Sequence, residues 1–153
     1  GKLKPINEHC AKLRKVAWGL MTGGSSPSVK QHAFQLFKRA CEWQYITYKI
    51  GADTASNKDA LGIASVDYLM YSGYVGMAHH WLMMEEAAAK ALAKGDGADL
   101  EQPKEFYEAK LQTAAFYYEN ILPRTETLTT TMFTPVETVM GMDPDHFSFD
   151  HAR

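Results

Sequence analysis

Residues 60–84 constrain the fold more than any other segment, because they carry a single formal charge, Asp67. A helix of this composition is apolar nearly all round. A helix at a protein surface needs a polar face, so such a helix must be covered on several sides. In a chain of 153 residues, a few neighbouring helices supply too little cover. We therefore expect the central helix of a bundle that is itself docked against something larger.

The same segment is long enough to cross a membrane, but its composition argues against this. Asp67, two histidines, two serines and three glycines interrupt its apolar residues. Its flanks also lack the lysine and arginine signature of an interface with lipid head groups. We therefore predict a buried or docked helix and no membrane partner.

The composition is that of a globular protein with a sizeable core. Hydrophobic residues make up 46% of the chain and aromatic residues 12%, which argues against disorder. A net charge of −2 and a pI near 6.3 give no electrostatic reason to expect nucleic acid, and no basic cluster with interleaved aromatics is found. We expect one domain over residues 1–153.

The two cysteines, Cys10 and Cys41, form neither a CxxC motif nor a zinc-type spacing. They predict buried free thiols on helices, in a reducing and cytoplasmic compartment. The chain opens on Gly1 without an initiator methionine or a targeting peptide. We expect it to be a fragment of a longer chain.

Helical periodicity and end signals divide the first two thirds of the chain into three helices. The first spans residues 6–21 and ends at the GGSSPS segment, where Ser26 or Ser28 can cap the next helix. The second spans residues 28–50, with Gly51 as its expected stop. It carries two apolar stripes and is therefore apolar over a wide arc. One stripe comprises Ala33, Leu36, Ala40, Trp43, Ile46 and Ile50, and the second comprises Phe34, Phe37, Cys41, Tyr45 and Tyr48.

The third helix begins near Asn57 or Asp59 and continues to Lys94, before the GDG at 95–97. Beyond Met84 its sequence, EEAAAKALAK, predicts an amphipathic end that tolerates solvent.

A fourth helix follows Pro103, and Pro123 is expected to kink it or to begin a new helix, because proline lacks an N–H and clashes one turn back. A short helix over 135–140 and a tail complete the chain. Short loops imply antiparallel neighbours. The predicted fold is all-α, an up-down-up-down four-helix bundle with a kinked last helix and a short terminal helix.

No catalytic, cofactor-binding or metal-binding motif emerges from the sequence. Di-iron bundles require two ExxH motifs, and this chain has none. The HExxH, CxxCH and GxSxG motifs and a glycine-rich phosphate loop are also absent. Asp143 and His146 have a D-x-x-H offset but lie in the tail with no second cluster. We predict no metal and no catalytic residue in this chain.

Three polar residues within the apolar segment have two interpretations each. Asp67 is either hydrogen-bonded to a tyrosine or lysine or is a carboxylate with a raised pKa. His79 and His80 must face different directions, and the simpler interpretation is a core histidine that bonds a backbone carbonyl. The alternative is a contact with a ligand.

Ser72, Gly73 and Gly76 form a notch of small residues on the third helix. Glycine costs about 1 kcal/mol in a helix interior, so a compensating contact is expected. We predict the close approach of a neighbouring helix, so that Gly76→Leu would destabilise the fold.

The segment FYEAKLQTAAFYYENILPRT at 106–125 resembles the closing part of the additional C-terminal domain found in a branch of the acyl-CoA dehydrogenases. That branch includes the 3-methylmercaptopropionyl-CoA dehydrogenase-like enzymes. Ala115 departs from the pattern, where an arginine is usual. The matching residues are Phe106, Tyr107, Lys110, Thr113, Ala114, Phe116, Tyr117, Leu122 and Pro123.

Two further segments, at 67–88 and 137–147, resemble the same family, so that the resemblance covers about residues 30–147. It implies an accessory bundle that packs on the catalytic core and shapes the acyl-CoA site or the subunit interface. FAD is implied for the parent enzyme and no cofactor for this chain, which should be inactive alone and part of a homo-oligomer. The competing interpretation is a free-standing helical module that binds another protein.

The expected interface and helix-contact residues combine the notch, its flanks and the family motif. They are Tyr68, Tyr71, Ser72, Gly73, Gly76, His79, His80, Trp81, Phe106, Tyr107, Lys110, Phe116 and Tyr117.

Overall fold

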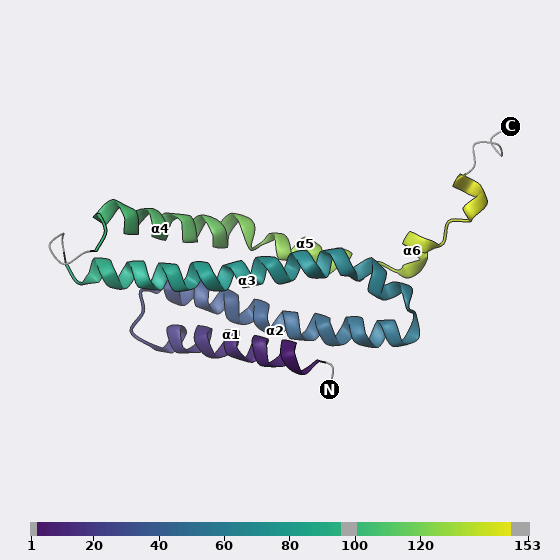
Figure 1. Ribbon diagram of the computed structural model, residues 1–153, viewed down its shortest axis with the longest axis horizontal. Helices are drawn as coiled ribbons and strands as arrows, with labels where there is room; N and C mark the ends of the chain where they lie inside the picture. The colour runs from purple at the N-terminus through teal and green to yellow at the C-terminus, as the bar shows by residue number, and fades with distance from the viewer. Residues whose placement is uncertain (1–2, 96–100, 148–153) are drawn as a thin grey trace.

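The computed structural model describes residues 3–95 and 101–147, and every regular element in these ranges is helical. Long helices run up and down beside one another, as Figure 1 shows. The predicted four-helix bundle with a kinked last helix is confirmed. The long elements are α1 (Lys4–Thr22), α2 (Pro27–Ser56), α3 (Asp59–Ala93), α4 (Lys104–Phe116) and α5 (Arg124–Thr131).

Local capping explains where α2 begins. The Ser26 side chain accepts a hydrogen bond from the Val29 N–H at 3.3 Å, and Pro27 occupies the first turn. A serine cap followed by proline is a strong start signal, because the serine oxygen accepts from an unpaired N–H of the first turn and proline brings no N–H that would need a partner. The predicted start is confirmed.

The predicted end of α2 at Gly51 is wrong, because the helix continues to Ser56. Gly51 lies at the surface and is not among the glycines with a positive φ, so it does not form a left-handed helix cap. The helix ends instead where the Asn57 N–H bonds the Asp53 carbonyl at 2.8 Å and the Asn57 backbone becomes extended. On α3 the end at Ala93 agrees with the prediction, and Gly95 beyond it has a φ of +125°. Residues 96 and 97 of the GDG segment lie outside the described residues.

Pro123 separates α4 from α5 through a π-helical turn, Tyr117–Ile121. The Leu122 N–H bonds the Tyr117 carbonyl at 2.9 Å, one residue further back than in an α-helix. Proline cannot donate a hydrogen bond, so the ladder must break where its N–H is missing. The predicted kink is confirmed. Tyr117 and Tyr118 lie within this turn, and both are buried.

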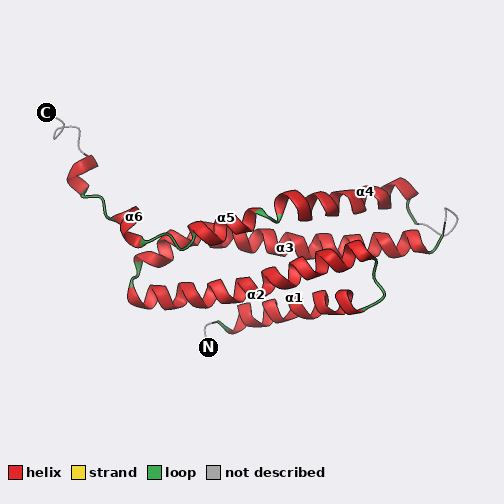
Figure 2. Ribbon diagram, turned by 180° about the vertical axis from the view of Figure 1, so that it is seen from behind, coloured by secondary structure: helices red, strands yellow, loops and turns green. Residues whose placement is uncertain are grey.

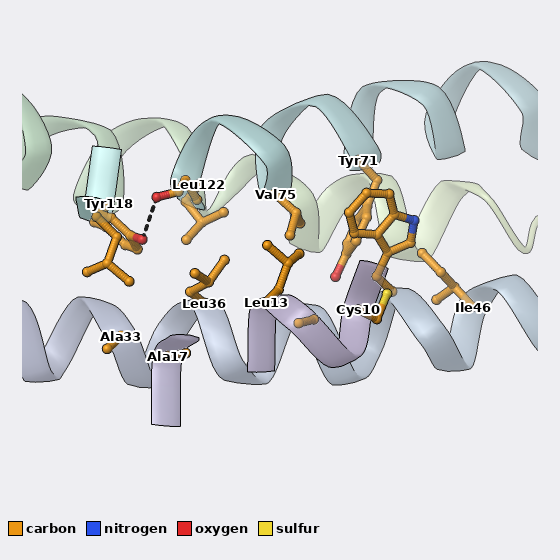
Figure 3. Packing of buried hydrophobic residues seen from close by; sticks show 14 of the residues in the cluster. Cys10, Leu13, Ala17, Ala33, Leu36, Ile46, Tyr71, Val75, Tyr118 and Leu122 are labelled. Carbon is orange, nitrogen blue, oxygen red and sulfur yellow. Dashed lines mark hydrogen bonds between the residues drawn. The ribbon is translucent and has the colours of Figure 1, made fainter. Parts of the chain in front are cut away.

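The core is a row of apolar side chains between the helices. Figure 3 shows Leu13, Leu36, Val75 and Leu122 meeting at its centre. Each of these side chains is at most 2% exposed. Cys10 is buried here as predicted, but Cys41 is exposed, because the second stripe of α2 faces solvent.

Two short elements, α6 (Val136–Met140) and a 3₁₀ turn (Pro144–Phe147), lead away from the bundle, as Figures 1 and 2 both show. The predicted short helix over 135–140 is confirmed. Among the described residues, none of the helices combines the length and apolar character needed to cross a bilayer.

Candidate functional site

One face of α3 is exposed and apolar along most of the helix. Its residues recur at alternating steps of four and three, and no member carries a formal charge. Val66 and Leu69 are 68% and 71% exposed, while Gly76 is half-buried. We call this row the α3 seam. It consists of Gly62, Val66, Leu69, Gly73, Gly76, His80, Met83 and Ala87.

The small-residue notch lies within the α3 seam and is open. A Cβ built on Gly73 or Gly76 meets no atom within 4 Å, and Ser72 bonds the Tyr68 carbonyl at 2.7 Å within its own helix. No helix among the described residues therefore approaches these glycines, and the prediction of such a contact inside the bundle is wrong. The bundle places the notch on the side of α3 that faces away from the core. A contact with a partner stays a prediction.

A groove of about 890 Å³ borders the seam between α2 and the first half of α3. Leu61 and Leu69 from α3 and Ile50 from α2 supply its apolar walls, with hydroxyl groups between them. Its lining contains no lysine or arginine, so it offers no cation for the diphosphate of FAD. The groove does not fit that cofactor and suits an apolar side chain.

The family-motif residues gather where α4 packs on α3. The Lys110 ammonium lies 5.2 Å from the Phe106 ring centroid and 5.7 Å from that of Trp81. The Tyr117 ring centroid lies 6.4 Å from that of Trp81, and the Tyr117 hydroxyl donates a hydrogen bond to the Tyr74 carbonyl at 2.8 Å. Cation–π contacts of this kind stabilise by about 0.5–1 kcal/mol at exposed sites. The Lys110–Trp81 contact joins α4 to α3, and the Tyr117 contacts join the π-helical turn to α3.

The remaining motif aromatics lie at the margin of this cluster. Tyr107 meets the edge of Phe106 at 5.4 Å. Phe116 is 55% exposed and points out of the bundle. Burial raises the pKa of Tyr117 to about 12, with a smaller contribution from Tyr74.

Two predicted contact tyrosines hold α3 against α2. The Tyr71 hydroxyl donates to the Arg39 carbonyl at 3.0 Å and lies 2.7 Å from a Glu42 carboxylate oxygen. The Tyr68 hydroxyl accepts from the Trp43 indole N–H at 3.1 Å and lies 2.8 Å from the Thr47 hydroxyl. Burial, and then the bond to Glu42, raises the pKa of Tyr71 far above its ordinary value.

Asp67 and the histidine pair differ from expectation. The Asp67 carboxylate accepts from the Thr131 hydroxyl at 2.6 Å, so its partner is a threonine rather than a tyrosine or lysine. His79 is half-buried and His80 exposed, as their adjacency requires. Within the described part of the chain, the buried Nδ1 of His79 has no hydrogen-bond partner, so the predicted bond to a backbone carbonyl is not found there. Burial, followed by the nearby His80, lowers the pKa of His79.

A buried polar cluster at the far end of α3 was not predicted. Glu85, 1% exposed, accepts from the Ser28 hydroxyl at 2.7 Å and lies 2.7 Å from His32 Nδ1. The His32 ring stacks on Tyr118 at 4.2 Å. The sequence predicted that the segment after Met84 tolerates solvent. That prediction does not hold throughout the segment, because Glu85 is buried. The usable signal was the pair Ser28 and His32, four residues apart on one face of α2.

The described residues contain no group of three or more metal-ligating side chains. The described residues form a helical bundle with one apolar face that carries no charge. Hydrogen bonds between buried polar groups hold its helices together. Exposed apolar faces of this kind usually mark interaction sites. The described residues define an all-helical bundle domain.

A sequence model described as acetyl-CoA dehydrogenase C-terminal like matches residues 3–143. The chain belongs to this family and is a C-terminal-type domain of the acyl-CoA dehydrogenases. The match includes α1, which the resemblance over residues 30–147 did not cover. Neither a curated protein nor a solved structure matches the chain.

Proposed function

We propose that the chain is the accessory C-terminal domain of an FAD-dependent acyl-CoA dehydrogenase of the 3-methylmercaptopropionyl-CoA dehydrogenase-like branch. It packs on the catalytic core and contributes to the subunit interface or to the shape of the acyl-CoA site. Other domains of the parent hold FAD and acyl-CoA, so this domain is not catalytic alone. We place the enzyme in the cytoplasm as a homo-oligomer.

The observation that carries this proposal is the gathering of exposed apolar side chains on separate faces of a small bundle. The α3 seam is one. The second is a row on α2, the α2 face, formed by Phe34, Cys41, Tyr45 and Tyr48. Phe34 and Tyr45 are 60% and 63% exposed. Monomeric proteins rarely expose large apolar patches, which usually mark interaction sites.

We assign the α2 face to the catalytic core. Aromatic side chains dominate the energetics of protein interfaces, and the α2 face presents three of them in one row. Trp18 of α1 extends the same aromatic surface, because its ring lies 6.1 Å from Phe37 of α2. Two separate faces suit a domain that has more than one neighbour in an assembly.

The test is co-purification of the chain with the dehydrogenase catalytic domains of the same organism. We expect Phe34→Glu to weaken that association, while Val66→Glu on the α3 seam leaves it intact. Flavin absorbance and acyl-CoA-dependent dye reduction should belong to the catalytic domains. Stoichiometric flavin or turnover in the isolated chain would contradict the proposal.

The second candidate is a free-standing protein-binding module. The same α2 face favours it, because an aromatic row can receive any apolar partner. Failure to associate with dehydrogenase domains, with Phe34→Glu abolishing capture of an unrelated protein, would favour this module over the accessory domain.

A further inference from the structure

The α3 seam has the spacing of a coiled-coil contact. Steps of four and three give a repeat of 3.5 residues, which keeps one stripe facing a partner helix as the two supercoil. Asp59 and Lys90 continue the same spacing at the two ends. From Asp59 to Lys90 the stripe is about 45 Å long at 1.5 Å per residue. No helix among the described residues occupies it at the glycines.

The seam complements a second copy of itself in antiparallel orientation. A two-fold axis between Gly73 and Gly76 sets these glycines opposite one another, which lets the helix axes come close. The next layers outward set Leu69 opposite His80, and Val66 opposite Met83. Such a two-fold contact uses the same patch on both copies and closes as a dimer.

The charges at the ends select this orientation. The antiparallel pairing sets Asp59 of one copy opposite Lys90 of the other, at both ends of the contact. A parallel pairing would set Asp59 against Asp59 and Lys90 against Lys90. Both residues are exposed, and Lys90 also contacts Glu86 of its own helix at 2.9 Å. Opposite charges at the ends fix register, and like charges disfavour the alternative.

We propose that two copies of this chain dimerise by antiparallel pairing of their α3 seams. This deepens the proposed role at a subunit interface and rests on it. The α2 face stays free for the catalytic core. Met83 of the second copy lies opposite Val66, next to the α2–α3 groove. An unbranched thioether side chain fills an irregular apolar groove well.

The first test is the mass of the chain in solution by light scattering across concentrations. We expect a dimer of the 17.1 kDa chain. Val66→Glu with Leu69→Glu should raise the dimer dissociation constant about tenfold or more. Both side chains are exposed, so the helical circular dichroism should not change. Phe34→Glu is the matched control and should leave the dimer intact.

The second test determines the relative orientation of the two α3 helices by cross-linking. In all variants the exposed Cys41 is replaced by serine. Val66→Cys and Met83→Cys variants are oxidised separately and as a mixture. We expect disulfide-linked dimers in the mixture and little in either variant alone. Cross-linking of Val66→Cys with itself would indicate a parallel pairing and overturn the proposal.

Different results would contradict the accessory role and the pairing of the α3 seams. A chain that is monomeric at all concentrations yet co-purifies with dehydrogenase catalytic domains would overturn the seam pairing and leave the accessory role standing. A dimer that persists in the Val66→Glu, Leu69→Glu variant would also overturn it. A dimer that depends on the seam but ignores those domains would support the pairing and contradict the accessory role.

Discussion

The two faces of α3 differ in their burial and in the contacts that their residues make. On the inner face, Leu82 is fully buried, Tyr71 bonds α2, and the Ala78 carbonyl accepts from Tyr118 at 2.8 Å. On the outer face, Leu69 is 71% exposed and Gly76 has open space beside it. Both faces are apolar in the sequence. The difference shows that apolar character alone does not tell which face a chain buries by itself.

The inner face gains its specificity from polar groups. Tyrosine hydroxyls and the Glu85 carboxylate fix the register of α3 against its neighbours, because an unpaired buried polar group costs about 1–3 kcal/mol. The outer face makes no such buried polar contacts, and at its glycines no atom of the described residues lies within 4 Å of a built Cβ. Substitutions on the two faces should therefore differ in their effect on the free energy of unfolding.

The largest effect on the free energy of unfolding is expected when a leucine is replaced by alanine on each face in turn. Leu82→Ala should lower the free energy of unfolding by about 2–5 kcal/mol, because it leaves a cavity in the core. Leu69→Ala should change it by about 0.5 kcal/mol or less when the chain is dilute enough to be monomeric. Urea denaturation measures both. Equal losses in the two variants would mean that the outer face is covered within the chain.

The next effect concerns the buried polar cluster. Glu85→Ala removes the partner of Ser28 and His32 and should lower the free energy of unfolding by about 1–3 kcal/mol. Glu108→Ala is the control, since Glu108 is exposed and its contact with Lys104 is 3.9 Å long. That variant should change stability by about 0.5 kcal/mol or less. An unchanged melting temperature for the Glu85→Ala variant would show that the cluster does not fix α3.

A small stabilisation is expected on the outer face. Gly76→Ala fills open space and gains helix propensity, so it should raise stability by up to about 1 kcal/mol. This replaces the expectation from the sequence that a larger residue at Gly76 destabilises the fold. Scanning calorimetry of a dilute sample would detect the rise in melting temperature. A lowered melting temperature would mean that something packs on the glycine.

A pH dependence is also expected from the inner face. Burial raises the pKa of Tyr117 to about 12 and also raises that of Tyr118. An unfolded tyrosine titrates near pH 10, so above about pH 10 the unfolded state binds fewer protons than the folded state. The free energy of unfolding should then fall as pH rises. Denaturation at about pH 9 and about pH 11 tests this, and Tyr117→Phe should reduce the slope. An equal stability at both values would contradict it.

Much of the helix layout could be predicted because the signals are local. Ser26 and Pro27 begin α2, and Pro123 breaks the last long helix, through their own hydrogen-bonding capacity. Gly51 failed as a stop signal, since glycine permits a left-handed turn without requiring one. The exposure of Cys41 could not be predicted either, because α2 has two apolar stripes and periodicity cannot choose between them.

The sequence by itself determined the helices, their order and the family, since periodicity, capping and motif residues act within short stretches of chain. Only the tertiary structure decided which stripe of α2 and which face of α3 are buried. It also brought Glu85 to Ser28 and His32, which are more than fifty residues away in sequence. The physical reason is that burial depends on the shape of the neighbouring helices and on the few polar groups that must be paired inside. Neither is encoded in the period of a single helix.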